Sequence, residues 1–386
     1  MRKEIVFITN GPAFHKNQKG YAAEYFLKFF DKVHFIYWSH EEFKDKYIDD
    51  KIVLHPYITK RGGFLLPLFY IFWSLKKLFK LKEEFKSKNS EGRLVFCAIS
   101  VAWAGIPALI AAKMMQIPVA LRMDSDMVGY MSIENKLLGK TGFISNVKLE
   151  LLKTLHYSLL PFFDAVIGIS EGISEKAKKY GAKNVFTIHI PINTDMFSPA
   201  TGGREGIRLL YAGQIKAMKG LHILVDVLRQ IKKEKDYAPL LHIVGSAMRP
   251  VDKSYKQQLI QDSQDLNVKF SDHVYIDKMP DIYREHDILV HPSYSEAQGM
   301  TIMEAMASGL AVVAFNTSGP KDLVEEGRTG FLVSSGDKKV LKERIETFLN
   351  DANLCRQMGI AGRNRVIDLV EETDEKYEHL WKMLTS

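Results

Sequence analysis

Cysteine is scarce in this chain: only Cys97 and Cys355 occur among 386 residues, and they lie far apart. Neither falls into the spacing of a metal-ligand set, so the pattern argues against both a disulfide framework and a cysteine-based metal site. Cys97 lies in the apolar run 94–98, which is typical of a buried strand. We expect free, inert thiols and a reducing cytoplasm as the compartment.

The sequence also contains no long apolar segment, and we expect its first residues not to form a signal peptide. No uncharged stretch reaches the roughly 18–20 apolar residues that a membrane span requires. Residues 1–10 carry two positive charges but too short an apolar stretch for a signal peptide, and they fit a first strand. We therefore expect neither secretion nor a membrane-crossing helix.

Two common phosphate-binding motifs are absent as well. The chain has no Gly-x-x-x-x-Gly-Lys-Ser/Thr loop, and the first strand–helix loop, residues 10–20, does not contain Gly-x-Gly-x-x-Gly. This argues against a P-loop nucleotide site and against NAD binding at the N-terminal loop.

The remaining composition, 46% hydrophobic and 26% charged, is that of a soluble globular protein whose length fits two domains. Residues 1–190 hold 28 Lys and Arg against 18 Asp and Glu, whereas the rest of the chain is slightly acidic. The basic half favours an anionic partner, such as nucleic acid, anionic lipid or a phosphorylated acceptor. Because no nucleic-acid recognition module is present, we expect no nucleic-acid partner.

Short apolar runs alternate with helical stretches, which is typical of parallel βα units. Strands are predicted at 5–9, 33–37, 94–99, 119–121, 165–169, 185–189, 208–212, 240–244, 274–276, 288–291, 311–314 and 330–333. Helices are predicted at 21–30, 104–115, 135–160, 174–180, 220–233, 255–266, 301–307, 339–350 and 354–384.

The alternation stops between Pro191 and Gly206, a stretch with two prolines, three glycines and no apolar periodicity. We predict an α/β protein with two Rossmann-like domains facing each other across a cleft. The N-terminal domain covers 1–190, the linker 191–206 and the C-terminal domain 207–365. Residues 366–386 are predicted to be a helix that packs back toward the N-terminal domain. The cleft is the expected ligand site, because ligands bind at the carboxyl ends of parallel strands.

The sharpest local signal follows the predicted strand 288–291. Gly299 permits close backbone approach, and a helix is predicted to start near Met300 and Thr301. The free amides of a first helical turn suit a phosphate or another anionic oxygen. Glu304 lies one turn further on and could accept hydrogen bonds from vicinal hydroxyls, while Glu296 would reach the other end of the same ligand. The alternative is that both are ordinary solvated acids.

A second element follows the predicted strand 208–212. Gly213 lets the chain pass close to a ligand, and Lys219, just before Gly220, supplies a compact positive charge for phosphates. A lysine at the start of a helix is usually only solvated, so this element is weak by itself.

Together these elements resemble family 4 of the retaining glycosyltransferases, which have the GT-B fold. The resemblance is strong over residues 185–335 and only architectural over 1–180. The matching features are the Glu-x7-Glu spacing of Glu296 and Glu304 followed by Ala-Met-Ala, a loop with Gly213, Lys219 and Gly220, the linker stretch 191–199, Ile243-Val244-Gly245, and residues 316–320 with 330–333.

The resemblance implies that the C-terminal domain holds a nucleoside-diphosphate sugar as donor substrate, with no further cofactor. Lys219 would pair with the diphosphate and Glu304 with the ribose. Glu296, together with the amides of residues 298–301, would meet the sugar and its phosphate. Main-chain groups near 274–278 would meet the base. Gly20 would approach the diphosphate from the N-terminal domain, an ordinary turn being the alternative.

The sequence departs from the family at three positions. Gln214 stands in place of an arginine, which leaves Lys219, with help from Lys216, to offset the diphosphate. Gln298 stands where an aromatic residue is frequent. Asp124 replaces a histidine that usually faces the acceptor. Asp124 and Asp126 also form an Asp-x-Asp pattern. We expect them to touch acceptor hydroxyls, or to have a loop role, rather than to bind metal.

Residues 61–88 combine aromatic and aliphatic side chains with lysines at helical spacing. The pattern fits a helix lying on an anionic membrane, on the inner face of the plasma membrane. It fits slightly better a helix packed on its own domain with a solvated lysine face.

The sequence thus predicts a retaining glycosyltransferase with a glycan or lipid-linked acceptor, acting in envelope polysaccharide synthesis. The alternatives are a non-catalytic sugar-nucleotide-binding or scaffold subunit, which Gln214 makes conceivable, and a sugar-nucleotide epimerase on the same fold. Donor base, donor sugar, acceptor, linkage and oligomeric state are not predicted.

Overall fold

A computed structural model describes residues 2–9, 21–39, 47–58, 66–88, 92–137, 139, 142–200, 202, 206–235, 237 and 239–386. The chain divides into two compact units. The first comprises residues 1–128, 143–191 and 372–386, and the second comprises 129–142 and 192–371. Neither unit is one continuous segment. Among the described residues, no helix has the length and apolar character needed to cross a membrane.

The first unit is built on an eight-stranded sheet with the order β3-β4-β2-β1-β5-β6-β7-β8. All described strand pairs are parallel except β3 with β4. The central strands are almost wholly apolar because helices cover both faces of a parallel sheet. The strands are β1 (Lys3–Ile8), β2 (Lys32–Ser39), β3 (Tyr47–Asp49), β4 (Ile52–Ile58), β5 (Arg93–Ile99), β6 (Val119–Met123), β7 (Ala165–Gly168) and β8 (Val185–Thr187).

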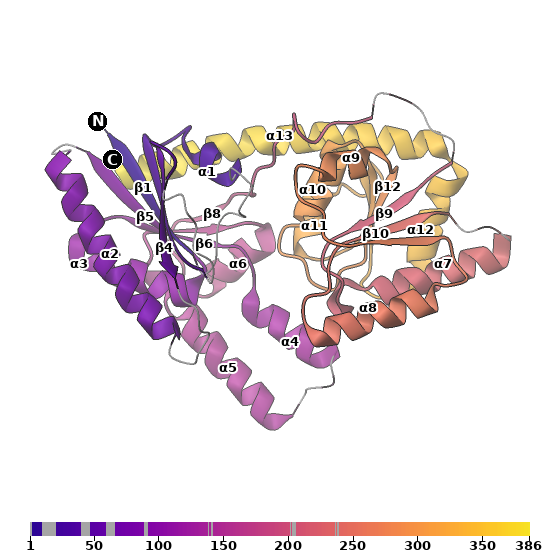
Figure 1. The fold of residues 1–386 in the computed structure, drawn as a ribbon, viewed down its shortest axis with the longest axis horizontal. Coiled ribbons are helices and arrows are strands. Elements are labelled where there is room, and N and C mark those ends of the chain that lie inside the picture. The colour runs from indigo at the N-terminus through magenta and orange to yellow at the C-terminus, as the bar shows by residue number, and fades with distance from the viewer. Residues whose placement is uncertain are drawn as a thin grey trace. The chain divides into compact units, whose positions relative to one another are not determined.

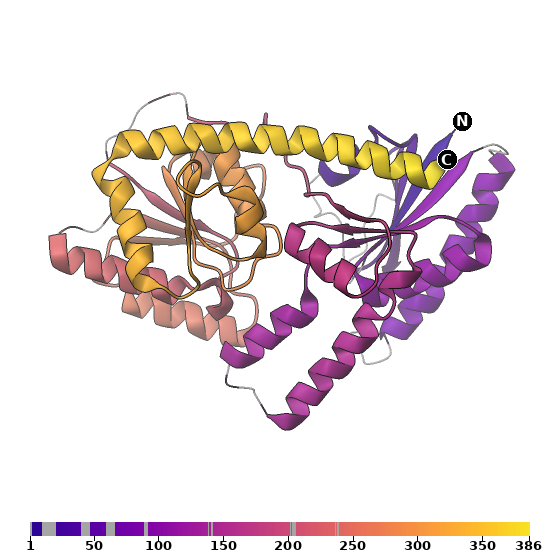
Figure 2. The ribbon, with the colours of Figure 1, turned by 180° about the vertical axis from the view of Figure 1, so that it is seen from behind.

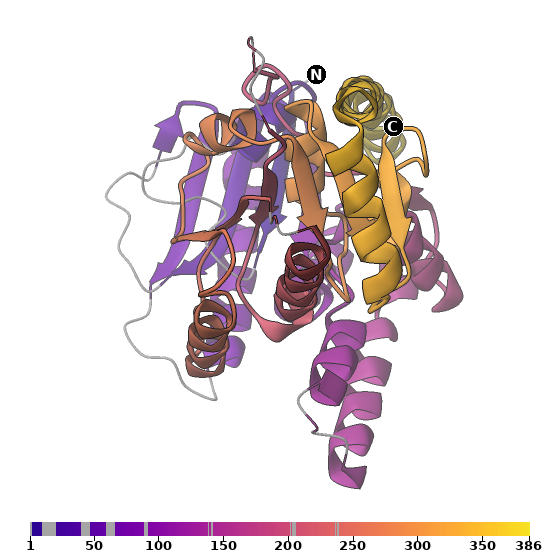
Figure 3. The ribbon, with the colours of Figure 1, turned by 90° about the vertical axis from the view of Figure 1, so that its right-hand side faces the viewer.

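The helices of this unit are α1 (Tyr21–Phe26), α2 (Leu66–Lys88), the π-helical turn η1 (Val101–Gly105), α3 (Ile106–Met115), α5 (Phe143–Tyr157), η2 (Leu160–Phe162) and α6 (Glu171–Lys179). Helices α2 and α3 lie side by side (Figures 1 and 2). Helix α5 extends away from the sheet of its unit (Figures 1 and 3).

The last helix, α13 (Ala352–Thr385), completes the core of the first unit with its C-terminal part. Tyr377 and Trp381 stack on each other with ring centroids 5.7 Å apart. Trp381 meets Phe30 edge-on at 5.3 Å, and Tyr377 meets Phe26 at 5.3 Å. These contacts bury large aromatic surfaces, so residues 372–386 are an integral part of the first unit's core.

The second unit has a six-stranded, fully parallel sheet with the order β11-β10-β9-β12-β13-β14. The strands are β9 (Leu209–Ala212), β10 (Leu241–Val244), β11 (Val268–Ser271), β12 (Ile288–His291), β13 (Ala311–Phe315) and β14 (Gly330–Val333). This is the 3-2-1-4-5-6 order of a doubly wound sheet, in which the connections diverge between the first and fourth strands. That switch point lies at the carboxyl ends of β9 and β12.

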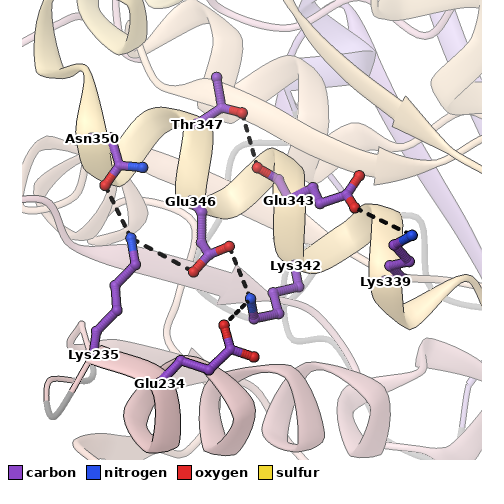
Figure 4. Close-up of polar contacts among 8 residues, drawn as sticks. All are labelled: Glu234, Lys235, Lys339, Lys342, Glu343, Glu346, Thr347 and Asn350. Atoms are coloured by element: carbon purple, nitrogen blue, oxygen red, sulfur yellow. Dashed lines mark hydrogen bonds and ion pairs between the residues drawn. The ribbon is translucent and has the colours of Figure 1, made fainter.

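The helices of the second unit are α4 (Met127–Leu137), η3 (Ala217–Lys219), α7 (Leu221–Lys235), α8 (Pro250–Asp262), α9 (Met279–Arg284), α10 (Met300–Ala307), α11 (Ser318–Leu323), α12 (Lys338–Asn350) and the first part of α13. Figure 4 shows the polar contacts between α7 and α12. Lys342 donates to Glu234 at 2.6 Å and to Glu346 at 3.0 Å, and Lys235 donates to Asn350 at 3.0 Å. These contacts tie the solvent-facing sides of two helices whose inner faces share one apolar core.

Two predicted elements are wrong. The single helix predicted over 135–160 is two helices, α4 and α5, and the stretch between them contains Gly139 with φ of 67° and Gly142. A left-handed glycine ends a helix, so this stretch breaks the predicted one. The strand predicted at 274–276 is not formed, because β11 pairs with β10 earlier in the chain, over Val268–Ser271.

Candidate functional site

The loop after β9 is shaped by glycines. Gly213 has φ of 147° and Gly220 has φ of 68°, backbone angles that residues other than glycine rarely adopt. A Cβ atom at Gly220 would lie 2.1 Å from the carbonyl oxygen of Pro292. The turn carrying Lys219 therefore packs directly against the loop that follows β12, and the amide of Tyr294 donates to the carbonyl of Met218 at 3.0 Å.

The loop after β12 leads into α10. Gly299 has φ of 92° and forms the N-cap of α10 without a side-chain cap. The amides of Met300 and Thr301 have no acceptor within the helix, as in any first helical turn. The amide of Gly319 donates to the carbonyl of Glu296 at 3.1 Å and fixes the loop from the far side. A helix start with free amides thus lies at the switch point of the sheet.

Lys219 and Glu296, predicted from separate motifs, are in direct contact. Lys219 Nζ donates to Oε2 of Glu296 at 2.6 Å, and His291 Nε2 lies 2.9 Å from the same oxygen. Burial acts to raise the pKa of Glu296, but the hydrogen bond from His291 and the charge of Lys219 outweigh it, so the pKa lies well below its usual range. Glu296 is therefore a carboxylate at neutral pH.

Glu304 lies in a different environment, one that favours its neutral form. Its side chain is buried in α10, and Oε2 accepts a hydrogen bond from the hydroxyl of Tyr283 at 2.7 Å. Burial raises the pKa of Glu304 to about 7, with the Tyr283 hydrogen bond acting in the opposite direction. The two glutamates of one motif thus differ in charge at neutral pH: Glu296 is ionised, whereas Glu304 is divided between its neutral and ionised forms.

The two glutamines of the site differ in exposure. Gln214 is exposed at the tip of the loop after β9. Its main-chain carbonyl accepts a hydrogen bond from the hydroxyl of Tyr211 at 2.7 Å. Gln298 is only 2% exposed, and its Nε2 lies 2.9 Å from the sulfur of Met303. The side chain of Gln298 therefore packs into the unit beneath α10.

Sequence reasoning missed the partners that hold the two glutamates. His291 was identified only as the last residue of a strand, and Tyr283 lies on α9, a helix that was not predicted. Both residues are buried. No local pattern marks them, although a histidine at the carboxyl end of a parallel strand is the signal that could have singled out His291.

Helix α4 adds a further group of side chains to the second unit. Lys216 lies over the ring of Tyr130, with Nζ 4.8 Å from the centroid. Arg249 donates to Glu134 at 2.7 Å and to Asp252 at 2.8 Å. Burial lowers the pKa of Lys216, and burial together with Glu134 raises the pKa of Tyr130. Residues from the N-terminal half of the sequence thus lie beside the loop that carries Lys219.

The two aspartates predicted on the acceptor side belong to the first unit and are already paired there. Both oxygens of Asp124 accept hydrogen bonds from the buried Arg122, at 2.6 and 2.8 Å. Asp126 accepts from the hydroxyl of Tyr157 and from Lys176. The part of the chain described here holds no cluster of His, Cys, Asp and Glu suited to a metal ion. Gly20 and the rest of loop 10–20 lie outside the described residues.

Helix α2 has two distinct faces. One face is buried on the first unit through Tyr70, Ile71, Ser74, Leu78, Leu81 and Phe85. The opposite face carries exposed apolar side chains beside charged ones: Leu68 is 50% exposed, Phe69 58%, Phe72 69% and Phe79 37%. Residues 61–65 of the predicted segment lie outside the described residues. The packed-helix interpretation accounts for the first face only.

Residues 199–365 match the family model described as glycosyl transferases, group 1. The capsular polysaccharide biosynthesis glycosyltransferase CapM of Staphylococcus aureus is 30% identical over 178 residues, which cover 46% of this chain and 44% of CapM. A D-inositol 3-phosphate glycosyltransferase of Streptomyces avermitilis is 29% identical over 215 residues, covering 51% of this chain and 46% of the relative. The chain thus spans less than half the length of these curated relatives.

Solved structures match over nearly the whole chain. Sucrose-phosphate synthase of Thermosynechococcus elongatus has a TM-score of 0.73 at 20% identity and covers 99% of both chains. HepE of Anabaena, solved in complex with UDP and glucose, has a TM-score of 0.69 at 18% identity, covering 97% of this chain and 98% of HepE. The predicted pair of Rossmann-like domains is confirmed. The chain has the GT-B fold, and its residues 199–365 match the group 1 glycosyl transferases.

Proposed function

We propose that this protein is a glycosyltransferase that moves a sugar from a nucleoside-diphosphate sugar to a glycan or lipid-linked acceptor in polysaccharide synthesis. The observation that carries the proposal is the contact of Lys219 with Glu296 beside the free amides of α10. A cation, a helix start and a carboxylate gathered at the switch point of a doubly wound sheet suit a ligand that has both a diphosphate and hydroxyl groups.

Each group has a distinct role toward such a donor. Lys219 and the amides of Met300 and Thr301 would bind the diphosphate. The ionised Glu296 would accept hydrogen bonds from sugar hydroxyls. Glu304 would accept from the ribose, since a carboxylate can accept two vicinal hydroxyls. The chain supplies charge stabilisation and positioning, so the reaction needs no acid–base pair of side chains.

We propose transfer with retention at the anomeric carbon. In this step the bond from that carbon to the diphosphate oxygen breaks, and the bond to the acceptor oxygen forms on the same face of the sugar. The proton of the acceptor hydroxyl passes to the departing phosphate oxygen. Charge grows on that oxygen as the bond breaks, so Lys219 and the α10 amides stabilise the transition state more than the ground state. No cofactor is required, because the donor itself supplies the leaving group.

The experiment is a thermal-shift screen with UDP-, GDP- and ADP-sugars, followed by mass spectrometry of the products formed with glycan and lipid-linked acceptors. UDP-sugars come first because HepE was solved with UDP. We expect one nucleotide class to raise the melting temperature and a glycosylated product to form. Stabilisation without transfer or hydrolysis would indicate a non-catalytic binding subunit, and failure of every sugar nucleotide to bind would refute the proposal.

We also propose that the first unit contacts an anionic membrane, consistent with a lipid-linked acceptor. The exposed side of α2 also carries Lys76, Lys80 and Lys86, together with Glu83 and Glu84, all of them exposed. Apolar side chains interspersed with lysines suit an interface that offers both acyl chains and anionic headgroups. A second apolar row, Val147, Leu151 and Leu155, is exposed at every fourth residue of α5.

Liposome sedimentation tests the membrane proposal. Wild-type protein should sediment with vesicles rich in phosphatidylglycerol and not with pure phosphatidylcholine, and Phe72→Glu should reduce sedimentation. Ile360→Glu is the matched control, because Ile360 is 58% exposed in the second unit. Equal sedimentation of both variants and the wild type would refute a role for α2.

A further inference from the structure

Both hydrogen-bond donors to Glu296 meet the same carboxylate oxygen. Lys219 Nζ lies 2.6 Å and His291 Nε2 lies 2.9 Å from Oε2. The other oxygen, Oε1, has no hydrogen bond within the described part of the chain. The carboxylate is thus anchored through one oxygen and leaves the second available to a ligand.

When a donor binds, the Lys219 ammonium, which has three N–H donors, would be shared between the carboxylate and the diphosphate. The proposed function requires this ammonium to turn toward the phosphates when the donor binds, which weakens its bond to Glu296. A buried carboxylate that loses its cation is poorly solvated and free to rotate. A second hydrogen-bond donor is therefore needed to keep Glu296 ionised and oriented in the donor-bound enzyme.

We propose that His291 is a positioning residue that holds Glu296 in place when Lys219 engages the donor's diphosphate. The inference rests on the proposed function. His291 ends β12 and is 2% exposed, and its ring packs nearly parallel to that of Tyr211, with centroids 6.2 Å apart. Tyr211 in turn donates to the carbonyl of Gln214. The imidazole is thus fixed by a strand and by an aromatic neighbour, whereas a lysine side chain is not.

The hydrogen bond of His291 also indicates which of its two ring nitrogens carries a hydrogen. Within the described part of the chain Nδ1 is buried and has no hydrogen-bond partner, while Nε2 faces a carboxylate, so Nε2 carries the hydrogen that is donated to Glu296. A leucine or phenylalanine would fill the same volume without leaving Nδ1 unsatisfied, so packing alone does not explain a histidine here.

The titratable groups around Glu296 come from three elements and one loop. Lys219 lies on η3, His291 on β12 and Tyr211 on β9, with Lys216 in the loop before η3. Once Lys219 moves away, His291 is the remaining direct donor to the carboxylate in the described residues. Its removal should therefore favour the protonated acid, and the acidic limb of the rate profile should move to higher pH.

The experiment compares three variants of the full chain in steady-state transfer assays over a range of pH. His291→Phe keeps a ring against Tyr211 but removes the donor. His291→Gln restores an N–H near the position of Nε2. His242→Phe is the matched control, because His242 is buried on β10, which β9 separates from β12, and its Nε2 lies 2.8 Å from the hydroxyl of Ser271, away from the site.

For His291→Phe we expect kcat to fall by about 10- to 100-fold with KM for the donor within about threefold of wild type, as for a misplaced reacting group. His291→Gln should recover most of this loss, and only His291→Phe should shift the acidic limb. Wild-type kcat and pH profile in His291→Phe would overturn the inference, whatever its melting temperature. If wild-type protein neither binds nor turns over a sugar nucleotide, the proposed function falls as well.

Discussion

Glu304→Gln should make the protein more stable than wild type at pH 8 and leave its stability nearly unchanged at pH 4.5. The pKa of Glu304 is raised by burial from 4.5 to about 7 in the folded chain. Between these values the folded state binds more protons than the unfolded state, so stability falls as pH rises through this range. At about 1.4 kcal/mol for each pKa unit, ionising this buried carboxyl costs on the order of 3 kcal/mol by pH 8. Glutamine has nearly the same shape and cannot ionise.

The measurement is urea unfolding of wild type and Glu304→Gln at several values between pH 4.5 and 8. The difference in unfolding free energy should grow with pH and level off above pH 7. Glu326→Gln serves as a control, because its carboxylate is exposed and forms an ion pair with Arg344. A difference that is the same at every pH would refute the reasoning that Glu304 changes charge on the folded protein.

The same group should couple donor binding to protons. A ribose that donates two hydrogen bonds to Glu304 favours the carboxylate, so binding below pH 7 should release a proton. Calorimetry at pH 6 in buffers of different ionisation enthalpy should detect that release, and it should vanish in Glu304→Gln. Identical heats in all buffers for the wild type would contradict a ribose contact by Glu304.

Three further outcomes follow from the site and its supports. Lys219→Ala should lower kcat/KM by about 100- to 1,000-fold, as for the loss of one charge-stabilising group, and unchanged kinetics would remove Lys219 from the mechanism. Gly220→Ala places a methyl group 2.1 Å from a carbonyl oxygen and should destabilise the protein by about 2 kcal/mol or more in urea unfolding, whereas Gly142→Ala, with open space around it, should not. Asp124→Ala leaves the buried Arg122 without its carboxylate and should cost about 1–3 kcal/mol, because the Asp124 side chain itself is 33% exposed. Activity lost in this variant therefore counts as evidence on acceptors only if the melting temperature is retained.

Much of the fold was predictable because its signals are local. Continuous apolar runs mark the parallel strands of both units, and glycines with Pro292 mark the turns that carry Lys219 and Glu296. Strand β4 was missed because His55 and Pro56 interrupt its apolar run, while its pairing with β2 supplies the missing support. The boundary between α4 and α5 was missed although Gly139 and Gly142 were visible in the sequence.

The site was predictable only in part, for a related reason. Glu296 and Glu304 are recognisable from their spacing, but their charge states depend on partners distant in the chain. Lys219 lies 77 residues from Glu296, and Tyr283 lies 21 residues from Glu304. The contacts of Tyr130 and Glu134 within the second unit have no local signature at all, since they depend on where α4 packs.

The discontinuous make-up of the first unit bears on how the chain reaches its native state on the ribosome. Tyr377, Leu380, Trp381 and Leu384 belong to the same apolar core as β1 and β2. During synthesis, the sheet that emerges first keeps part of its apolar surface uncovered until the C-terminal part of α13 has been made, nearly two hundred residues later. A stop codon placed after residue 371 should therefore give an aggregation-prone product even though every residue of the second unit is present.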